Sequence, residues 1–442
     1  MLRHMTIHRT FIAILALTAP LAPPLVAQST FHGDNARTGV FDSVAPAAAP
    51  RVVWKFQTDA PIFSSAAVVG GAVYITSDDS FLYALDEATG GLKWKFETQG
   101  RVASSPAVRD GVVYFGSYDG SFYAVDSATG MEKWKFNTEY ERRFAAPGIH
   151  GNLPAHQIIP DAWDFYQSSP VVDSGHVYFG SGDGNVYALD AMSGALRWKF
   201  HTGDVVHSSP AIADGTLYIG SFDTWLYAID AASGTERWRF KTGEDPVRYN
   251  QTGLTSSPVV VGGTVYFGCR DAHVYAVDAA TGKQKWAYYT DQGWVSATPA
   301  VRDNTLYVGS GSSLKVFALD TATGAPRFTV PIKSAIFSSV ALVGNLAVVG
   351  TFSGELDAFD ATTGAFVWEF VTDAHKADNR KIFKPDGTLD ADVLGRSMFG
   401  DFENMYVAMD KRLSVGSILA SPVIDKGTIF IGTAEGILYA LR

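Results

Sequence analysis

Two adjacent arginines, Arg142 and Arg143, stand in the segment that holds most of the chain's reactive side chains, EYERRFAAPGIHGNLPAHQIIPDAWDFYQ (residues 139–167). A guanidinium group presents paired N–H donors that match a carboxylate or a phosphate, so two arginines facing a cavity could hold either anion. The alternative is that both arginines pair with Glu139 and Glu141 and fix the loop. The segment therefore predicts either an anion site or an ion-paired loop.

The same segment contains two histidines, His150 and His156, and histidine is a common metal ligand. Two histidines six positions apart in a loop are weak grounds for a metal centre, and we predict that the chain holds none. The single cysteine, Cys269, excludes an intrachain disulfide and is interpreted as a small buried residue, not a reactive thiol.

Other side chains that could contact a ligand lie outside this segment. His207 and Trp294 precede predicted inner strands, and Arg270 stands where other copies of a repeat have a small residue. Arg248 and Asn250 could bind a ligand or satisfy the backbone of a tight loop. The predicted ligand-binding set is Arg142, Arg143, His150, His156, Asp164, Tyr166, His207, Arg248, Asn250, Arg270 and Trp294.

A repeated unit must position these residues. One copy, residues 104–138, reads SSPAVRDGVVYFGSYDGSFYAVDSATGMEKWKFNT. Alternation of large apolar with small or polar residues predicts four strands joined by tight turns, where glycine supplies positive φ. The beginning of the unit occurs eight times, at Ser64, Ser104, Ser168, Ser208, Ser256, Ala297, Ser338 and Ala420.

The aspartate that ends each third strand marks the period of the repeat. Successive spacings are 40, 64, 40, 48, 42 and 40 residues, and a period near 40 with four strands predicts a β-propeller. The chain opens with an isolated fourth strand around Trp54 and ends with an isolated set of three strands. The predicted fold is therefore an all-β, eight-bladed propeller of four-stranded antiparallel blades, whose N-terminal strand closes the last blade.

The pattern AxDxxTGxxxW in these units resembles the repeat of the PQQ-like superfamily, which includes quinoprotein alcohol dehydrogenases and the assembly protein BamB. The resemblance covers Val52 to Arg442. For a dehydrogenase it implies pyrroloquinoline quinone (PQQ) at the channel mouth, held by arginines and calcium, with an aspartate as general base. The segment AWDFYQ offers Asp164 as that base, whereas the single cysteine excludes the vicinal disulfide usual in such enzymes.

Three stretches exceed the 40-residue period, namely residues 139–167, 243–255 and 373–417. All three join a fourth strand to the next first strand, so we predict that they gather over one mouth of the channel. In the third, DFENMYVAMDKRL predicts a short amphipathic helix with Asp401 as its N-cap, packed with its apolar side toward that mouth.

The ends and the charge of the chain predict its location. Residues 1–27 are typical of a secretory signal peptide, residues 28–50 form an N-terminal extension, and residues 51–442 form the propeller. The net charge is −10, and without residues 1–27 it becomes −12, from 33 basic against 45 acidic residues. Such a charge argues against a nucleic-acid partner. We expect a soluble periplasmic or secreted monomer without a membrane span.

Two functions fit these observations. The first is a binding or scaffold module in the bacterial cell envelope, which holds an unidentified protein or a small anionic ligand at the channel mouth. The second is a PQQ-dependent quinoprotein dehydrogenase that oxidises an alcohol or a sugar with PQQ and calcium. We favour the first, and no cofactor is predicted with certainty.

Overall fold

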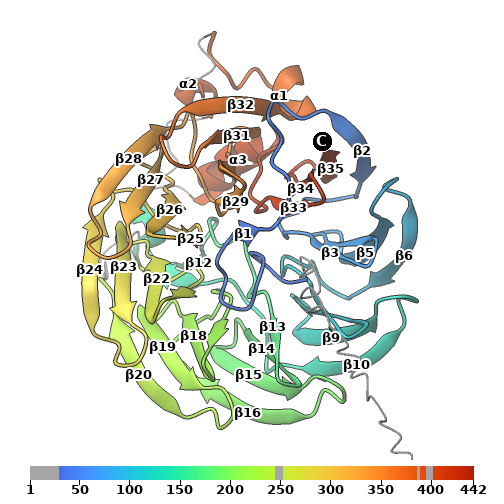
Figure 1. Cartoon of the computed structure of the whole chain (residues 1–442), viewed down its shortest axis with the longest axis vertical. Helices are drawn as coiled ribbons and strands as arrows, with labels where there is room; N and C mark the ends of the chain where they lie inside the picture. Colours follow the sequence, from blue (N-terminus) through green and yellow to red (C-terminus); the bar gives the residue numbers. More distant parts are fainter. Residues whose placement is uncertain (1–28, 244–251, 386–388, 395–401) are drawn as a thin grey trace, which may run out of the picture.

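The computed structural model describes residues 29–243, 252–385, 389–394 and 402–442, which form a ring of eight four-stranded sheets (Figure 1). The predicted signal peptide, Asp401, Arg248 and Asn250 lie outside the described residues. Within those residues, no helix is long and apolar enough to cross a membrane. The ring confirms the predicted eight-bladed propeller.

Each blade is an antiparallel meander that runs outward from the channel. Blade 1 consists of β3 (Ala67–Val69), β4 (Ala72–Thr76), β5 (Phe81–Asp86) and β6 (Leu92–Glu97), and blade 2 of β7 (Ala107–Arg109), β8 (Val112–Ser117), β9 (Ser121–Asp126) and β10 (Glu132–Asn137). Blade 3 consists of β13 (Val171–Asp173), β14 (His176–Gly180), β15 (Asn185–Asp190) and β16 (Leu196–His201), and blade 4 of β17 (Ala211–Ala213), β18 (Thr216–Gly220), β19 (Trp225–Asp230) and β20 (Glu236–Lys241). Blade 5 consists of β21 (Val259–Val261), β22 (Thr264–Gly268), β23 (His273–Asp278) and β24 (Gln284–Tyr289), and blade 6 of β25 (Ala300–Arg302), β26 (Thr305–Gly309), β27 (Lys315–Asp320) and β28 (Pro326–Pro331). Blade 7 consists of β29 (Ala341–Val343), β30 (Leu346–Gly350), β31 (Glu355–Asp360) and β32 (Phe366–Val371), and blade 8 of β33 (Val423–Asp425), β34 (Thr428–Gly432), β35 (Ile437–Leu441) and β2 (Val52–Gln57).

The two ends of the chain close the ring in blade 8. β2 pairs antiparallel with β35, so that Trp54 lies opposite Ala440. The backbones of Arg51 and Arg442 exchange two hydrogen bonds of 2.7 and 2.8 Å. This pairing confirms the prediction that the N-terminal strand completes the last blade, and it removes an exposed sheet edge.

The repeat motif explains how neighbouring blades pack. The Asp86 carboxylate accepts from the backbone and hydroxyl of Thr89, which fixes the turn before the fourth strand. Gly90, at φ +71°, lies so close to the Trp54 ring that a Cβ atom would approach it to 2.6 Å. Trp54 in turn donates its indole N–H to the carbonyl of Glu87 at 3.0 Å. The motif therefore joins one blade to the next, and the fourth-strand tryptophans serve this packing and not ligand binding.

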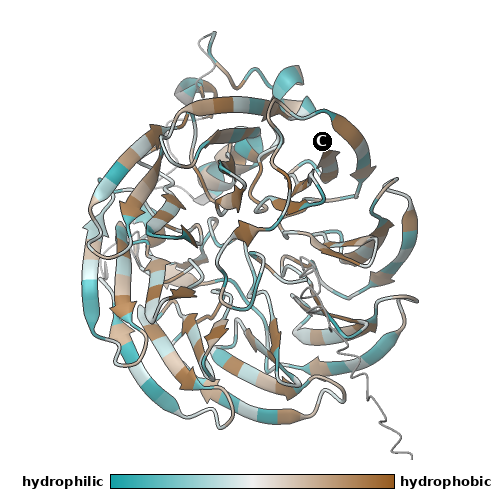
Figure 2. Cartoon of the chain, viewed as in Figure 1, coloured by the Kyte–Doolittle hydropathy of each residue, from teal (hydrophilic) through white to brown (hydrophobic). Residues whose placement is uncertain are grey.

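Hydropathy follows the position of each strand in its blade. The second strands are almost entirely buried, as in β4, whereas the outermost strands alternate exposed and half-buried residues, as in β6. Figure 2 shows this difference as hydrophobic inner strands and banded outer strands. Alternation with a period of two buries one side of each outer strand against its neighbour.

A ring of eight hydroxyl side chains lies where the blades meet the channel. Each hydroxyl oxygen accepts a hydrogen bond from the backbone N–H of the equivalent residue in the preceding blade, at 2.9 to 3.3 Å. The last member donates back to the first, so the chain of hydrogen bonds is continuous. The members of this hydroxyl ring are Ser65, Ser105, Ser169, Ser209, Ser257, Thr298, Ser339 and Ser421.

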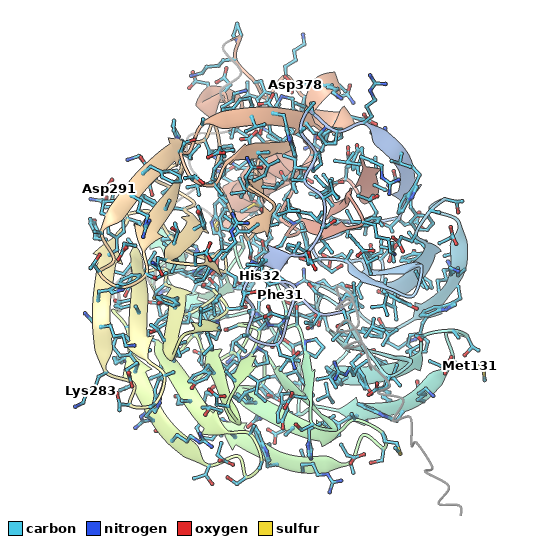
Figure 3. All side chains as sticks on the ribbon, viewed as in Figure 1. Phe31, His32, Met131, Lys283, Asp291 and Asp378 are labelled. Atoms are coloured by element: carbon cyan, nitrogen blue, oxygen red, sulfur yellow. The ribbon has the colours of Figure 1, made fainter. Side chains whose placement is uncertain are left out.

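The N-terminal extension crosses one end of the channel, and we call residues 29–41 the arm. Its carbonyl oxygens accept hydrogen bonds from the inner strands β7, β17, β21, β25 and β29, and the Asn35 side chain donates to a carbonyl of β13. The arm ends in β1 (Val40–Phe41), which adds to β29 in parallel. Figure 3 shows its residues Phe31 and His32 over the centre of the ring. The channel end that the arm covers is the arm mouth.

The opposite end, the insertion mouth, is covered by the first and third insertions. The first forms a hairpin of β11 (Ala145–Pro147) and β12 (Ile158–Pro160) around a 3-10 turn, η1 (Ile149–Gly151). The third contains α1 (Asp373–Ala377), α2 (Ala391–Leu394) and α3 (Phe402–Leu413).

The two insertions meet over the channel. Met405 and Met409 of α3 are buried in one apolar cluster with Trp163 of the first insertion and with Phe63 and Phe337, which line the channel. These contacts confirm that the first and third insertions gather at one mouth and that an amphipathic helix packs there. Of the second insertion, the described residues 252–255 reach the same cavity through Thr255.

Candidate functional site

The centre of the channel is a small enclosed cavity. Phe31 lines it from the arm, whereas Tyr166, His207 and Phe337 line it from the insertion mouth. The volume of this cavity is about 30 Å³. This is room for about one or two water molecules, far below the several hundred Å³ of an ordinary ligand pocket.

The first buried ion network lies above this cavity and joins the first insertion to blade 5. Asp161 and Arg270, both completely buried, form an ion pair. His150 contacts the same carboxylate at 2.8 Å. Burial alone would raise the pKa of Asp161, but Arg270 and His150 outweigh it and hold that pKa well below its usual range. The Arg270 guanidinium also lies 5.0 Å from the Trp294 ring.

The second buried network centres on His207. Its Nδ1 contacts Asp164 at 2.7 Å and its Nε2 contacts Glu141 at 2.8 Å, so both ring nitrogens have carboxylate partners. The other oxygen of Asp164 accepts from the backbone N–H of Phe144 at 2.8 Å. Burial would lower the pKa of His207, but Asp164 and Glu141 outweigh it and raise the pKa to about 9. The imidazole is therefore a cation at neutral pH.

The two adjacent arginines have different surroundings. Arg142 forms an ion pair with Asp204 at 2.8 Å, while Glu139 pairs with Lys199. The alternative that Arg142 pairs with Glu139 or Glu141 is therefore wrong, because Asp204, between blades 3 and 4, and Lys199, on β16, provide the partners of Arg142 and Glu139. Arg143 instead turns toward α3, where it interacts with Tyr406.

Arg143 helps to form a third polar cluster at the insertion mouth, which we call the mouth cluster. Arg101 lies 3.9 Å from the centre of the Tyr118 ring and 3.5 Å from the Asp78 carboxylate. Burial raises the pKa of Asp78, and the charges of Arg101 and Arg143 lower it only in part. Asp78, Arg101 and Tyr118 come from blades 1 and 2, and Arg143 from the first insertion.

Three atoms of the mouth cluster are buried without a hydrogen-bond partner among the described residues. They are Asp78 Oδ1, the Tyr118 hydroxyl and Arg143 Nε. A buried polar atom without a partner costs about 1–3 kcal/mol, so three together mark a place where something other than protein completes the hydrogen bonds. The side chains of Asp78 and Arg101 are 13% and 25% exposed, so the edge of the cluster borders solvent while the three atoms themselves are buried.

The remaining predicted residues do not converge. The Tyr166 hydroxyl lies within hydrogen-bonding distance of the backbone carbonyls of Phe337 and Leu419, at 3.2 and 3.0 Å. His156 is exposed on the tip of the β11–β12 hairpin. Cys269 is completely buried, and burial raises the pKa of its thiol, which agrees with a structural role.

Sequence reasoning missed two members of the mouth cluster, Asp78 and Tyr118. Both follow the second strand of their blade, at a position where blades 3, 4 and 5 carry Gly182, Phe222 and Arg270. That position varies between copies although the turn around it repeats, and this variation is the signal that could have identified it. Within the described residues, no group of three or more His, Cys, Asp or Glu is arranged to hold a metal ion.

Comparison with models of known protein families shows to which family the chain belongs. The family model described as outer membrane protein assembly factor BamB matches residues 42–153 and 160–370. The chain belongs to this family. A comparison with curated proteins finds no significant match.

Solved structures with the same fold as this BamB-type chain include BamB itself, alcohol dehydrogenases and a designed protein. BamB from Moraxella catarrhalis is 14% identical, with a TM-score of 0.62 over 89% of this chain and 97% of that protein. Quinohemoprotein alcohol dehydrogenase from Comamonas testosteroni is 15% identical, with a TM-score of 0.69 over 94% and 80%. The computationally designed protein Ika8 is 16% identical, with a TM-score of 0.61 over 90% and 99%. Identities this low show a shared fold and not a shared function.

Proposed function

We propose that this BamB-type propeller is a binding module of the bacterial cell envelope that holds a small carboxylate ligand at the mouth cluster. The observation that carries the proposal is the set of three buried atoms without partners, Asp78 Oδ1, Tyr118 hydroxyl and Arg143 Nε. They come from three separate segments of a rigid scaffold, where binding residues are commonly found.

The chemistry of these atoms suggests the class of ligand. Arg143 Nε can only donate and the Tyr118 hydroxyl can donate, so both suit an acceptor such as a carboxylate oxygen. Asp78 Oδ1, when the carboxylate is ionised, can only accept, so it suits a hydroxyl or ammonium donor. A small hydroxy- or amino-carboxylate offers both kinds of group, and Arg101 adds a second positive charge beside it.

PQQ fits the described residues poorly. The channel cavity of about 30 Å³ is too small for a fused tricyclic quinone, and within the described residues no group of three or more His, Cys, Asp or Glu side chains is placed to hold a metal ion. Asp164, the expected base, has both oxygens engaged by His207 and by the backbone of Phe144. Because this arrangement has neither the space nor a free base, it supports a binding function over the dehydrogenase.

A ligand screen tests the proposal. Purified protein is heated with a panel of small hydroxy- and amino-carboxylates, and we expect one class to raise the melting temperature in a saturable way. Calorimetric titration then compares variants. Arg143→Gln should weaken binding at least about tenfold, since a charge-assisted hydrogen bond contributes roughly 1.5–3 kcal/mol. The proposal fails if no carboxylate binds, or if Arg143→Gln binds as wild type does.

Arg142→Gln is the matched control, because the adjacent arginine is ion-paired with Asp204. It should bind the ligand with unchanged affinity. The dehydrogenase alternative has its own test, in which the protein is incubated with PQQ and calcium. We expect no stoichiometric quinone absorbance and no dye reduction with alcohols or sugars, and a bound quinone would instead favour the enzyme.

A further inference from the structure

We propose that the channel cavity binds one small monovalent anion of the halide type within the hydroxyl ring. This site is separate from the mouth cluster and does not depend on the carboxylate proposal. Three observations carry it: hydroxyl groups left without acceptors, a buried arginine without a counter-ion, and a cavity of the right size.

The hydroxyl ring offers hydrogens that no protein group accepts. Each ring oxygen already accepts a backbone N–H from the preceding blade, as Ser169 does from Ser105 at 3.0 Å. A hydroxyl has one hydrogen to donate, and among the described residues none of the eight ring hydroxyls donates to a protein acceptor. The ring therefore surrounds the channel with available O–H donors.

Two further hydroxyls line the same cavity. Ser296, which is only 7% exposed, has a buried Oγ without a partner, and so has Thr255 Oγ1. The cavity lining contains no acidic side chain among the described residues. Each ring oxygen already accepts one backbone N–H while its own O–H has no protein acceptor, and the lining offers no carboxylate, so the groups that remain favour an anion over a cation.

Arg37 supplies the charge at the arm side of the ring. It is completely buried, and its guanidinium donates to neutral oxygens that include the carbonyls of Ser169 and Pro210 at 3.0 Å each. Within the described residues all of its hydrogen bonds go to neutral oxygens and none to a carboxylate, and Asp34 acts on it only through its charge. It lies 5.2 Å from the Phe31 ring, which itself lines the cavity. Buried charges are normally paired, so an anion on this side would balance the arginine.

On the insertion side of the cavity, the His207 network and the mouth cluster together carry no excess positive charge that would attract the anion there. Their cationic and acidic side chains balance, with His207, Arg101 and Arg143 against Asp164, Glu141 and Asp78. On the arm side, Arg37 adds a positive charge that no described carboxylate contacts. The free space of about 30 Å³ suits one particle of about the size of a water molecule, as a halide is.

Bromide tests the site directly. Crystals of the full chain are grown or soaked in sodium bromide and measured at the bromine absorption edge. We expect one anomalous peak inside the hydroxyl ring, between Phe31 and Ser296. Ordered water alone at that place, or bromide only on the outer surface, would overturn the proposal.

A solution measurement gives the second readout. The melting temperature should be a few degrees higher in chloride than in gluconate at equal ionic strength, because an ion bound only to the folded state stabilises it. Ser296→Ala should reduce this difference. Ser334→Ala is the matched control, since Ser334 also has a buried Oγ without a partner but does not line the cavity. Equal melting temperatures of the wild type in both salts would contradict the site.

Discussion

The two mouths of the channel are closed by different means. At the arm mouth, backbone carbonyls of residues 29–41 accept hydrogen bonds from the inner strands of five blades, and one buried arginine contacts only neutral oxygens. At the insertion mouth, charged side chains form separate networks around Asp161, around His207 and around Asp78. At the arm mouth most contacts with the inner strands come from backbone carbonyls, with Asn35 and Arg37 adding side-chain hydrogen bonds, whereas at the insertion mouth charged side chains form ion networks.

The difference indicates which end carries specificity. A closure built from backbone hydrogen bonds holds blades together whatever the side chains are, so it suits a structural role. A closure built from ion networks can satisfy most of its members and leave a few open for a ligand. Among the described residues, the mouth cluster at the insertion mouth brings together three polar atoms without partners and borders solvent at Asp78 and Arg101.

The largest expected effect comes from removing the closing strand. A chain that begins at residue 58 lacks both the arm and β2, so β35 loses its outer partner. We expect failure to fold or aggregation, because an open ring exposes a sheet edge and separates two blades. Size-exclusion chromatography and circular dichroism measure this. A chain that begins at residue 51 keeps β2 and should fold with reduced stability. If both truncated chains behaved alike, the pairing of β2 with β35 would not be what closes the ring.

Breaking the Asp161 network should have the next largest effect. Asp161→Asn leaves Arg270 completely buried without its counter-charge, which costs about 3–5 kcal/mol in unfolding free energy. Chemical denaturation measures the loss. Asp204→Asn breaks the half-exposed pair with Arg142 and should cost at most about 1 kcal/mol. Equal losses would show that burial does not distinguish the two pairs.

The His207 network predicts a pH dependence of smaller size. Because the pKa of His207 rises from 6.5 to about 9 on folding, its contribution is fully present below pH 6.5 and is lost as the pH rises through 9. The shift corresponds to a contribution on the order of 3 kcal/mol. The unfolding free energy should therefore fall between pH 6.5 and 9, and His207→Gln should flatten this fall. His156→Gln, on the exposed hairpin tip, is the control and should follow the wild-type profile.

The repeat made most of the fold predictable. The Asp, Gly and Trp recur because they make the same contact between most neighbouring blades, as Trp54 does with Gly90 and Glu87, although Phe328 replaces the tryptophan in blade 6. The closure by β2 followed from counting half-units at the two ends. The arm was not predicted, because most of its contacts with the inner strands are made by backbone carbonyls, which leave no residue pattern.

The candidate site was predicted only in part. The first insertion was identified as chemically unusual, and Arg143, Asp164 and His207 were named from it and its surroundings. Their partners could not be assigned, since His207 meets carboxylates 43 and 66 positions away in the chain. Asp78 and Tyr118 sit in turns that otherwise look regular, and only the spatial arrangement brings them to Arg143.

A crystal structure with the carboxylate that binds best in the ligand screen tests the central claim most directly. We predict density for the ligand at the insertion mouth, with hydrogen bonds to Arg143 Nε, the Tyr118 hydroxyl and Asp78 Oδ1. Density for water alone at these three atoms, with the carboxylate bound elsewhere on the propeller, would contradict the account.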